Sequence, residues 1–183
     1  LAKRQQMENS FILFNIDRFK NLNDARGHRQ GDLLLIAVSE RLGHLLREGD
    51  LLTRVAADEF AILLLVAQGT AVTASRHALS VSERIHEALL QPFDFGDEVS
   101  LVTASLGITH FPLGAEDSPQ EVLRRADTAL HRAKDAGGNQ SAFFDVAMGE
   151  LTQQRFQIEH ALRQGIGAGE LRLYIQPQVD AGR

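Results

Sequence analysis

The chain has 183 residues, of which 44% are hydrophobic, so it is long enough to bury the core of one domain and to begin a second. Its formal net charge is -5, and no basic stripe stands out, which argues against nucleic-acid binding. The absence of cysteine excludes disulfides and fits a reducing compartment. The longest apolar run, 61–67, is far shorter than a membrane span. We therefore expect a cytoplasmic segment without membrane contact of its own, while an anchor elsewhere in a longer parent protein stays open.

Short apolar runs typical of buried strands alternate with longer segments whose apolar residues recur at helical spacing. The clearest helix start is at Ser118, where a capping serine is followed by Pro119 and Glu121. This order predicts one mixed sheet with helices packed mainly on one face, an α+β fold. In chain order the predicted elements are strand 11–17, helix 19–25, helix 31–47, strands 50–55 and 60–66, helix 71–90, strand 98–111, helix 119–136 and strand 141–145.

The sequence changes in character after residue 146. A connecting helix is predicted over 150–164, followed by a glycine-rich turn at 165–169 and a new strand at 171–176. A strand this close to the end of the chain has no predicted partner. The last residues are therefore expected to begin a second domain.

Polar side chains gather at two predicted strand ends. Asn15 and Asp17 end the first strand, and Asp58 and Glu59 are expected at the tip of the hairpin between the second and third strands. Converging carboxylates of this kind suit a divalent cation with phosphate ligands, since Mg²⁺ prefers hard oxygen ligands. The alternative is that these residues simply face water.

The segment 17–32 is dense in residues that recognise nucleotides. Asn23 and Asp32 together offer the donor and acceptors that match the edge of guanine. Lys20 offers a point charge to a phosphate. Each residue alone has an ordinary explanation in a turn, a cap or solvent, and only the group indicates a site.

Four motifs in order give the chain its resemblance to a known family. They are NIDRFKNLNDARGHRQGDLLL at 15–35, RVAADEF at 54–60, SLGI at 105–108 and RADTALHRAKDAGGN at 125–139. Residues 10–146 resemble a GGDEF (diguanylate cyclase) domain. The resemblance implies a central sheet flanked by helices, similar to nucleotidyl cyclases and the polymerase palm, with a ferredoxin-like core.

Members of this family condense two GTP molecules into cyclic di-GMP across a homodimer interface, with Mg²⁺ or Mn²⁺. The resemblance therefore implies a catalytic, a metal-binding and a nucleotide-binding set of residues in this chain. The catalytic set is Asn15, Asp58 and Glu59, the metal set is Asn15, the Ile16 carbonyl and Asp58, and the nucleotide set is Phe19, Lys20, Asn23, Asp32 and Lys134.

Three departures from the family pattern weaken the implied active site. Asn15 stands where the family has an acidic metal ligand, which removes one charge. Ala56 and Ala57 replace both signature glycines, at about 1 kcal/mol or more each if the hairpin needs a positive φ there. Gly138 replaces an arginine that contacts phosphate in the family. Together these changes predict a weakened metal site and impaired cyclisation.

Arg47 and Asp50 form an R-x-x-D motif in the register of the family's inhibitory site, which binds cyclic di-GMP. A guanidinium fork and a carboxylate suit phosphate and guanine, although such a pair is also a common surface ion pair. The histidines show no metal-ligand spacing: His28 is expected to be structural, and His110 and His131 are assigned no role.

The end of the chain, LRQGIGAGELRLYIQPQVD at 162–180, resembles the opening of an EAL domain, the cyclic di-GMP phosphodiesterase module. The predicted organisation is a GGDEF-like domain at 1–146, a connecting helix and linker at 147–169, and a first EAL-like strand at 170–183. The favoured function is a catalytically impaired module that binds GTP and regulates a fused EAL domain. An active diguanylate cyclase and a cyclic di-GMP receptor are the alternatives.

Overall fold

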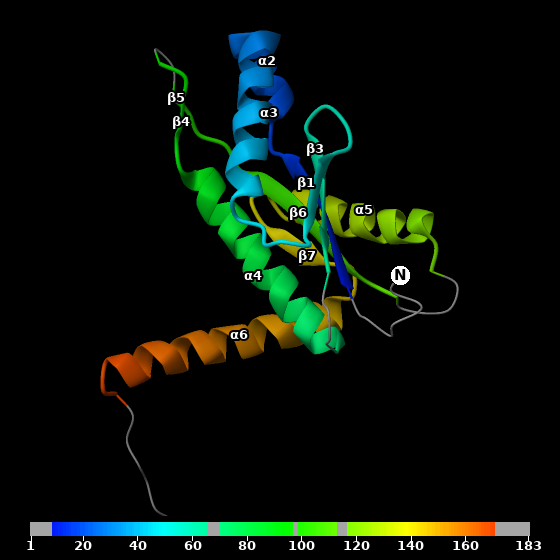
Figure 1. Cartoon of the computed structure of the whole chain (residues 1–183), viewed down its shortest axis with the longest axis vertical. Coiled ribbons are helices and arrows are strands. Elements are labelled where there is room, and N and C mark those ends of the chain that lie inside the picture. The colour runs from blue at the N-terminus through cyan, green and yellow to red at the C-terminus, as the bar shows by residue number, and fades with distance from the viewer. Residues whose placement is uncertain (1–8, 66–69, 97–98, 113–116, 171–183) are drawn as a thin grey trace, which may run out of the picture.

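The computed structural model describes residues 9–65, 70–96, 99–112 and 117–170. Figure 1 shows a central sheet with long helices on its two sides. The elements are β1 (Asn9–Ile16), α2 (Phe19–Arg26), α3 (His28–Gly43), β2 (Leu51–Arg54), β3 (Glu59–Leu64), α4 (Ala71–Leu90), β4 (Phe93–Asp94), β5 (Val99–Ser100), β6 (Ala104–Phe111), α5 (Pro119–Asp135), β7 (Ser141–Phe143) and α6 (Val146–Gly167).

The main sheet has five strands in the order β2-β3-β1-β6-β7. All neighbouring strands are antiparallel except β6 and β7, which are parallel. β1 therefore lies at the centre of the sheet, paired with β3 on one side and with β6 on the other. The predicted α+β class with one mixed sheet is confirmed.

Alternate side chains of β1 face opposite helix layers. Ile12, Phe14 and Ile16 are fully buried in a core shared with α3 and α4. Leu13 points the other way and is buried against Ala126 and other residues of α5. The expectation that helices pack mainly on one face is therefore wrong for α5. Successive side chains of a strand point to opposite faces of the sheet, and both faces of β1 are covered by helices. The central strand therefore has to be apolar throughout.

Several predicted boundaries are shifted in the structure. α3 extends over His28–Gly43 instead of 31–47, and α6 already begins at Val146. Helix formation starts at His28 because Gly27, with φ 85°, ends α2 and turns the chain directly into α3. The predicted strand at 171–176 lies outside the described residues. Within the described ranges, no helix combines the length and apolar character needed to cross a membrane.

The predicted strand 98–111 is divided in two. Only Ala104–Phe111 joins the main sheet, while Val99–Ser100 pairs with the unpredicted Phe93–Asp94 in a small separate hairpin. The Arg26 guanidinium donates to the Val99 carbonyl at 3.0 Å and to Ser100 Oγ at 2.8 Å, which holds this hairpin against α2. Such a tertiary contact leaves no trace in the local apolar pattern.

His110, which the sequence left without a role, is buried in the core at 5% exposure. Its Nδ1 lies 2.9 Å from Ser10 Oγ and its Nε2 lies 2.8 Å from Ser75 Oγ. Because Ser10 donates its hydroxyl proton to the Ala74 carbonyl, it accepts from Nδ1. Burial lowers the pKa of His110 to about 4, so the ring is neutral and joins β1, β6 and α4.

We predict that Gly107→Ala strongly destabilises the domain. A Cβ at Gly107 of β6 would lie 2.1 Å from the Ala126 carbonyl oxygen and 2.3 Å from the Leu130 nitrogen of α5. Since both contacts are with backbone, the helix has to move, and we expect the free energy of unfolding to fall by about 3 kcal/mol in urea denaturation. Gly43→Ala is the control, because a Cβ there meets nothing within 4 Å. Equal unfolding midpoints for the two variants would contradict this packing.

Candidate functional site

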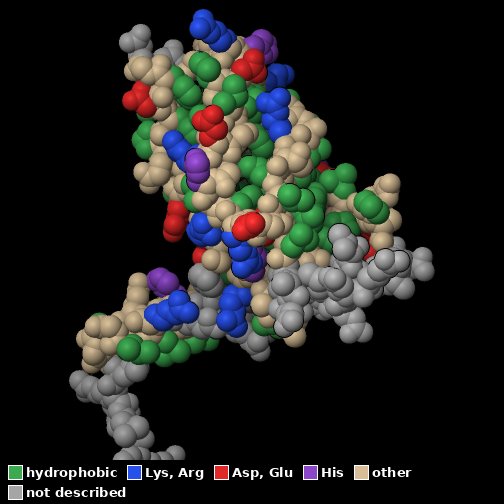
Figure 2. All heavy atoms as spheres, in the orientation of Figure 1, with side chains coloured by type: hydrophobic (Ala, Val, Ile, Leu, Met, Phe, Trp, Pro, Cys, Tyr) green, Lys and Arg blue, Asp and Glu red, His purple; other side chains and the backbone are tan. Residues whose placement is uncertain are grey.

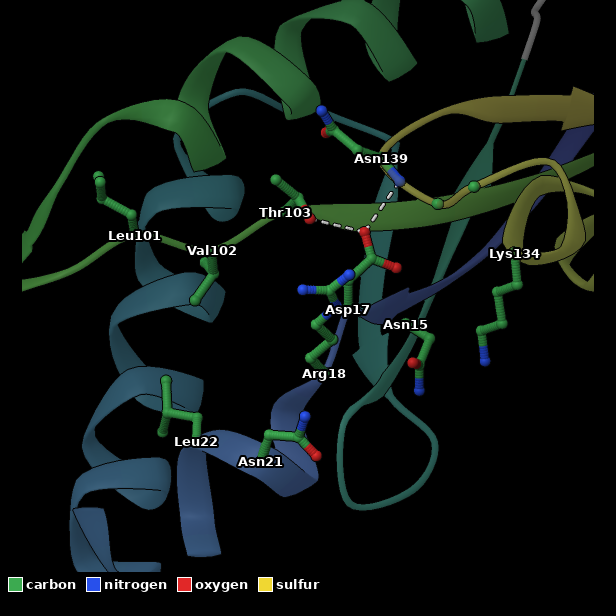
Figure 3. A pocket seen from close by; sticks show the side chains of 12 residues that line it. Asn15, Asp17, Arg18, Asn21, Leu22, Leu101, Val102, Thr103, Lys134 and Asn139 are labelled. Atoms are coloured by element: carbon green, nitrogen blue, oxygen red, sulfur yellow. Dashed lines mark hydrogen bonds between the residues drawn. The ribbon is translucent and has the colours of Figure 1, made fainter. Parts of the chain in front are cut away.

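An open pocket of about 920 Å³ lies where β1 ends and α2 begins. Its walls come from four parts of the chain: the β1–α2 junction, the residues before β6, the last turn of α5 and the turn before β7 (Figure 3). The lining residues are Asn15, Asp17, Arg18, Asn21, Leu22, Leu101, Val102, Thr103, Lys134, Gly137, Gly138 and Asn139.

The carboxylate of Asp17 holds these walls together. It accepts hydrogen bonds from Thr103 Oγ1 at 2.7 Å and from the Asn139 backbone nitrogen at 2.9 Å (Figure 3). It also accepts one from Ser105 Oγ at 2.6 Å. The Asp17 nitrogen in turn donates to the Thr103 carbonyl at 2.8 Å. Asp17 was noted in the sequence only as a polar residue at a strand end. Its structural role depends on contacts across 86 to 122 positions of the chain.

His86 of α4 lies behind the pocket wall. Its Nε2 is 2.9 Å from Ser141 Oγ, at the start of β7. Burial lowers the pKa of His86, and the charge of the nearby Asp17 opposes this shift to a smaller extent. The helix α4 is thus connected to the same strand ends that form the pocket.

The candidate metal ligands lie where the end of β1 is next to the start of β3. Asn15 of β1 is directly opposite Glu59 of β3, and the Ile16 nitrogen donates to the Asp58 carbonyl at 3.1 Å. Glu59 is the first residue of β3 and not part of the hairpin tip. Within the described ranges, no group of three or more His, Cys, Asp or Glu residues is arranged to hold a metal ion. The oxygen donors of Asn15 and Asp58 and the Ile16 carbonyl are of the hard type that Mg²⁺ prefers, and this ion usually keeps water or phosphate oxygens among its ligands.

The signature hairpin carries its two alanines without backbone strain. Among the described residues other than glycine, only Arg18 and Asn139 have a positive φ. Ala56 and Ala57 are exposed, and the Ala56 nitrogen donates to the Glu59 carbonyl at 3.3 Å. The conditional expectation of a strain penalty at these positions does not hold, and only the space taken by their methyl groups remains as an effect.

The predicted nucleotide residues are divided between two places. Lys134 lines the pocket, whereas Phe19, Lys20, Asn23 and Asp32 lie beside it on α2 and α3 and are not part of its lining. Phe19 is buried at 6% exposure, and Lys20 and Asp32 are exposed.

Asn23 Oδ1 is a buried oxygen without a hydrogen-bond partner in the described part of the chain. Its amide occupies the space above Gly31, because a Cβ on that glycine would lie 1.8 Å from Oδ1. Buried acceptors are normally satisfied, so this oxygen indicates a missing donor. The glycine spacing in the sequence could have indicated this close approach, but not the orphaned oxygen.

Arg47 and Asp50 form a separate cluster at the far end of α3. Arg47 Nε lies 3.6 Å from Asp50 Oδ2, with side-chain exposures of 57% and 2%. His77 Nε2 of α4, which the sequence did not single out, lies 3.7 Å from the same oxygen. The pKa of His77 is lowered by burial and then by the charge of Arg47. Neither Asp50 Oδ2 nor His77 Nε2 has a hydrogen bond within the described residues.

The fold is that of a GGDEF domain, as the similarity to solved GGDEF structures shows. A family model described as diguanylate cyclase, GGDEF domain, matches residues 1–140. The chain belongs to this family, and the resemblance drawn from its motifs is confirmed.

Similar proteins include two from Pseudomonas aeruginosa. MucR, named a bifunctional diguanylate cyclase/cyclic di-GMP phosphodiesterase, is 35% identical over 97% of this chain and 25% of its own length. NbdA, named a cyclic di-GMP phosphodiesterase, is 34% identical over 91% of this chain and 20% of its own length. The crystal structure of the GGDEF domain of YfiN from the same organism is similar with a TM-score of 0.70 and 30% identity, over 78% of this chain and 85% of that one. The chain thus spans a quarter or less of these two curated relatives.

We predict that Asp17→Asn loosens the pocket wall. The new amide group places a donor opposite at least one of the existing donors, so we expect the free energy of unfolding to fall by about 2 kcal/mol. Asp24→Asn makes the same change on the exposed side of α2 and serves as the control. Urea denaturation of both variants measures the difference, and an Asp17 variant as stable as the control would contradict the role of this carboxylate.

Proposed function

We propose that the chain is the nucleotide-binding domain of a cyclic di-GMP signalling protein, which binds GTP but is impaired in its cyclisation. In the whole protein, GTP binding controls a fused EAL phosphodiesterase domain. The observation that carries GTP binding is the buried, unpartnered Asn23 Oδ1 over Gly31. An active diguanylate cyclase is the alternative.

Asn23 and Asp32 supply the groups that guanine requires. When the Asn23 amide turns its oxygen from Gly31 towards the base, this oxygen accepts from a guanine N–H and gains the hydrogen bond that it lacks. The exposed Asp32 carboxylate on α3 is a second acceptor for the same base edge. Lys20, on the first turn of α2, and Lys134, in the pocket, neutralise phosphate.

The residues of the proposed metal site favour nucleotide binding over catalysis. Asp58, the Ile16 carbonyl and the Asn15 amide oxygen would hold Mg²⁺ or Mn²⁺ together with the phosphates. When bound, such an ion neutralises phosphate charge and favours ionisation of an attacking hydroxyl. Asn15 orients a ligand but contributes no charge, so Asp58 and Glu59 supply the carboxylates of the proposed metal site. Condensation also needs a second subunit, and we propose a homodimer.

The regulatory part of the proposal rests on the chain beyond α6. Residues 170–183 resemble the start of an EAL domain, and MucR and NbdA carry phosphodiesterase in their names. We propose the division into a GGDEF domain at 1–146, a linker at 147–169 and an EAL start at 170–183. α6 packs against α4 and β7, so it connects the pocket-bearing strand ends with the proposed EAL start.

We predict that the chain binds GTP with Mg²⁺ in calorimetry but forms no cyclic di-GMP above the Asp58→Ala blank when products are separated by chromatography. Gly31→Ala should abolish GTP binding, because its Cβ displaces the end of the Asn23 side chain and lies 3.0 Å from Phe19 Cζ. Urea denaturation checks that this variant still folds. In the full-length protein, GTP should change the rate of phosphodiester hydrolysis.

A restored variant is the sharpest control for this prediction. Asn15→Asp combined with Ala56→Gly and Ala57→Gly returns the missing charge and removes both methyl groups, and it should form cyclic di-GMP. Product from the unchanged chain above the blank would refute the impaired cyclase. No heat with millimolar GTP would refute the binding module.

Cyclic di-GMP binding at Arg47 and Asp50 is a second candidate function. The observation that favours it is the pairing of an exposed guanidinium with a carboxylate that is 2% exposed and whose Oδ2 has no hydrogen bond within the described residues. A guanidinium fork binds a phosphate or the Hoogsteen edge of guanine, and the carboxylate accepts guanine N–H groups.

We predict that Arg47→Ala weakens cyclic di-GMP binding at least tenfold, because one charge-assisted contact is lost (about 1.4 kcal/mol). Arg29→Ala, an exposed arginine at the other end of α3, should leave the affinity unchanged. Titration calorimetry measures both. Equal affinities for the two variants would exclude this site.

A further inference from the structure

We infer that Arg18 contacts the phosphates of the nucleotide and supplies the guanidinium that is missing at Gly138. The inference rests on the proposed binding of GTP. Arg18, Gly138 and Lys134 all line the same pocket, where β1 passes into α2 (Figure 3). Nothing in the motif pattern of the sequence pointed to Arg18.

The backbone at Arg18 is held in an unusual conformation. Its φ of 56° and ψ of 25° are left-handed, which costs a residue with a side chain about 1 to 2 kcal/mol. Bonds on both sides maintain it, since the Asp17 nitrogen donates to the Thr103 carbonyl and the Leu22 nitrogen donates to the Arg18 carbonyl at 3.2 Å. The strain keeps this side chain at the pocket, as is common at binding sites.

The guanidinium of Arg18 is available for a ligand. The side chain is exposed, and no hydrogen bond or ion pair occupies it within the described ranges. Its acidic neighbour Asp17 already accepts from Thr103, Ser105 and the Asn139 nitrogen. Two cationic side chains, Arg18 and Lys134, thus face a pocket whose lining contains one carboxylate, and this favours a polyanion.

Residues 138 and 18 both lie next to Asp17 in the wall of the pocket. A Cβ on Gly138 would lie 3.4 Å from both carboxylate oxygens of Asp17, and Arg18 is the next residue in the chain after Asp17. A guanidinium from either position therefore starts beside Asp17 and extends into the same pocket. Its planar fork binds phosphate oxygens in pairs, which lysine cannot do.

Arg18→Gly tests the inference without a risk to folding, because glycine adopts a φ of 56° without strain. Calorimetry with GTP and with guanosine, each with Mg²⁺, separates phosphate from base recognition. We expect GTP to bind about tenfold more weakly to the variant and guanosine to bind equally well. Arg163→Ala on α6 removes the same charge outside the pocket and should change neither affinity.

The double variant Arg18→Gly with Gly138→Arg provides the rescue. Since Gly138 has φ 75°, the new arginine takes on the left-handed strain that Arg18 carries in the unmodified chain, so urea denaturation checks that the variant is folded. It should recover most of the lost GTP affinity, which a purely structural role of Arg18 would not permit. Unchanged GTP affinity in Arg18→Gly, or an equal loss for guanosine, would overturn the inference while the proposed function stands. An unmodified chain that binds no GTP would overturn the proposed function and this inference with it.

Discussion

The pocket depends on one carboxylate that is hydrogen-bonded to three separate parts of the chain. Asp17 ends the central strand, and its oxygens receive the hydroxyls of Thr103 and Ser105 at β6 and the Asn139 nitrogen before β7. Charge-assisted bonds of this kind are stronger than neutral ones, so they fix the relative position of the strand ends. Lys134 lies on the last turn of α5, just before the turn that contains Asn139. A single acidic side chain therefore fixes the relative positions of the pocket walls.

The α2–α3 side of the candidate site and the end of β1 differ in which polar groups they provide. Between α2 and α3, the buried Asn23 oxygen over Gly31 has no hydrogen-bond donor within the part of the chain that the structure describes. At the end of β1, Asn15 lies opposite Glu59 of β3 and contributes no charge. Under the proposed function, this asymmetry favours nucleotide binding over catalysis. Since α6 packs on α4 and β7, occupancy of the pocket has a physical route to the C-terminal end of the chain.

Local patterns were sufficient for most of the fold. The apolar runs predicted the five strands of the main sheet, and the Ser118 cap with Pro119 predicted the start of α5, where Ser118 Oγ accepts from the Glu121 nitrogen. The predictions from local patterns that were wrong have a common cause, which is that the structure there depends on contacts between distant residues. The β4–β5 hairpin is too short to show a period and is held by Arg26 of α2, and the face chosen by α5 depends on its close approach to Gly107.

The residue types of the site, and the positions where they depart from the family pattern, could be predicted from the sequence, because motif spacing and substitutions such as Asn15 need no knowledge of the fold. The folded chain alone reveals that Asp17 joins three segments and that the left-handed Arg18 has no hydrogen bond or ion pair among the described residues. It also reveals that His110 is buried and neutral, and that the two alanines have no positive φ. The physical reason is that hydrogen-bond partners, burial and backbone angles are set by segments that lie up to 122 positions apart.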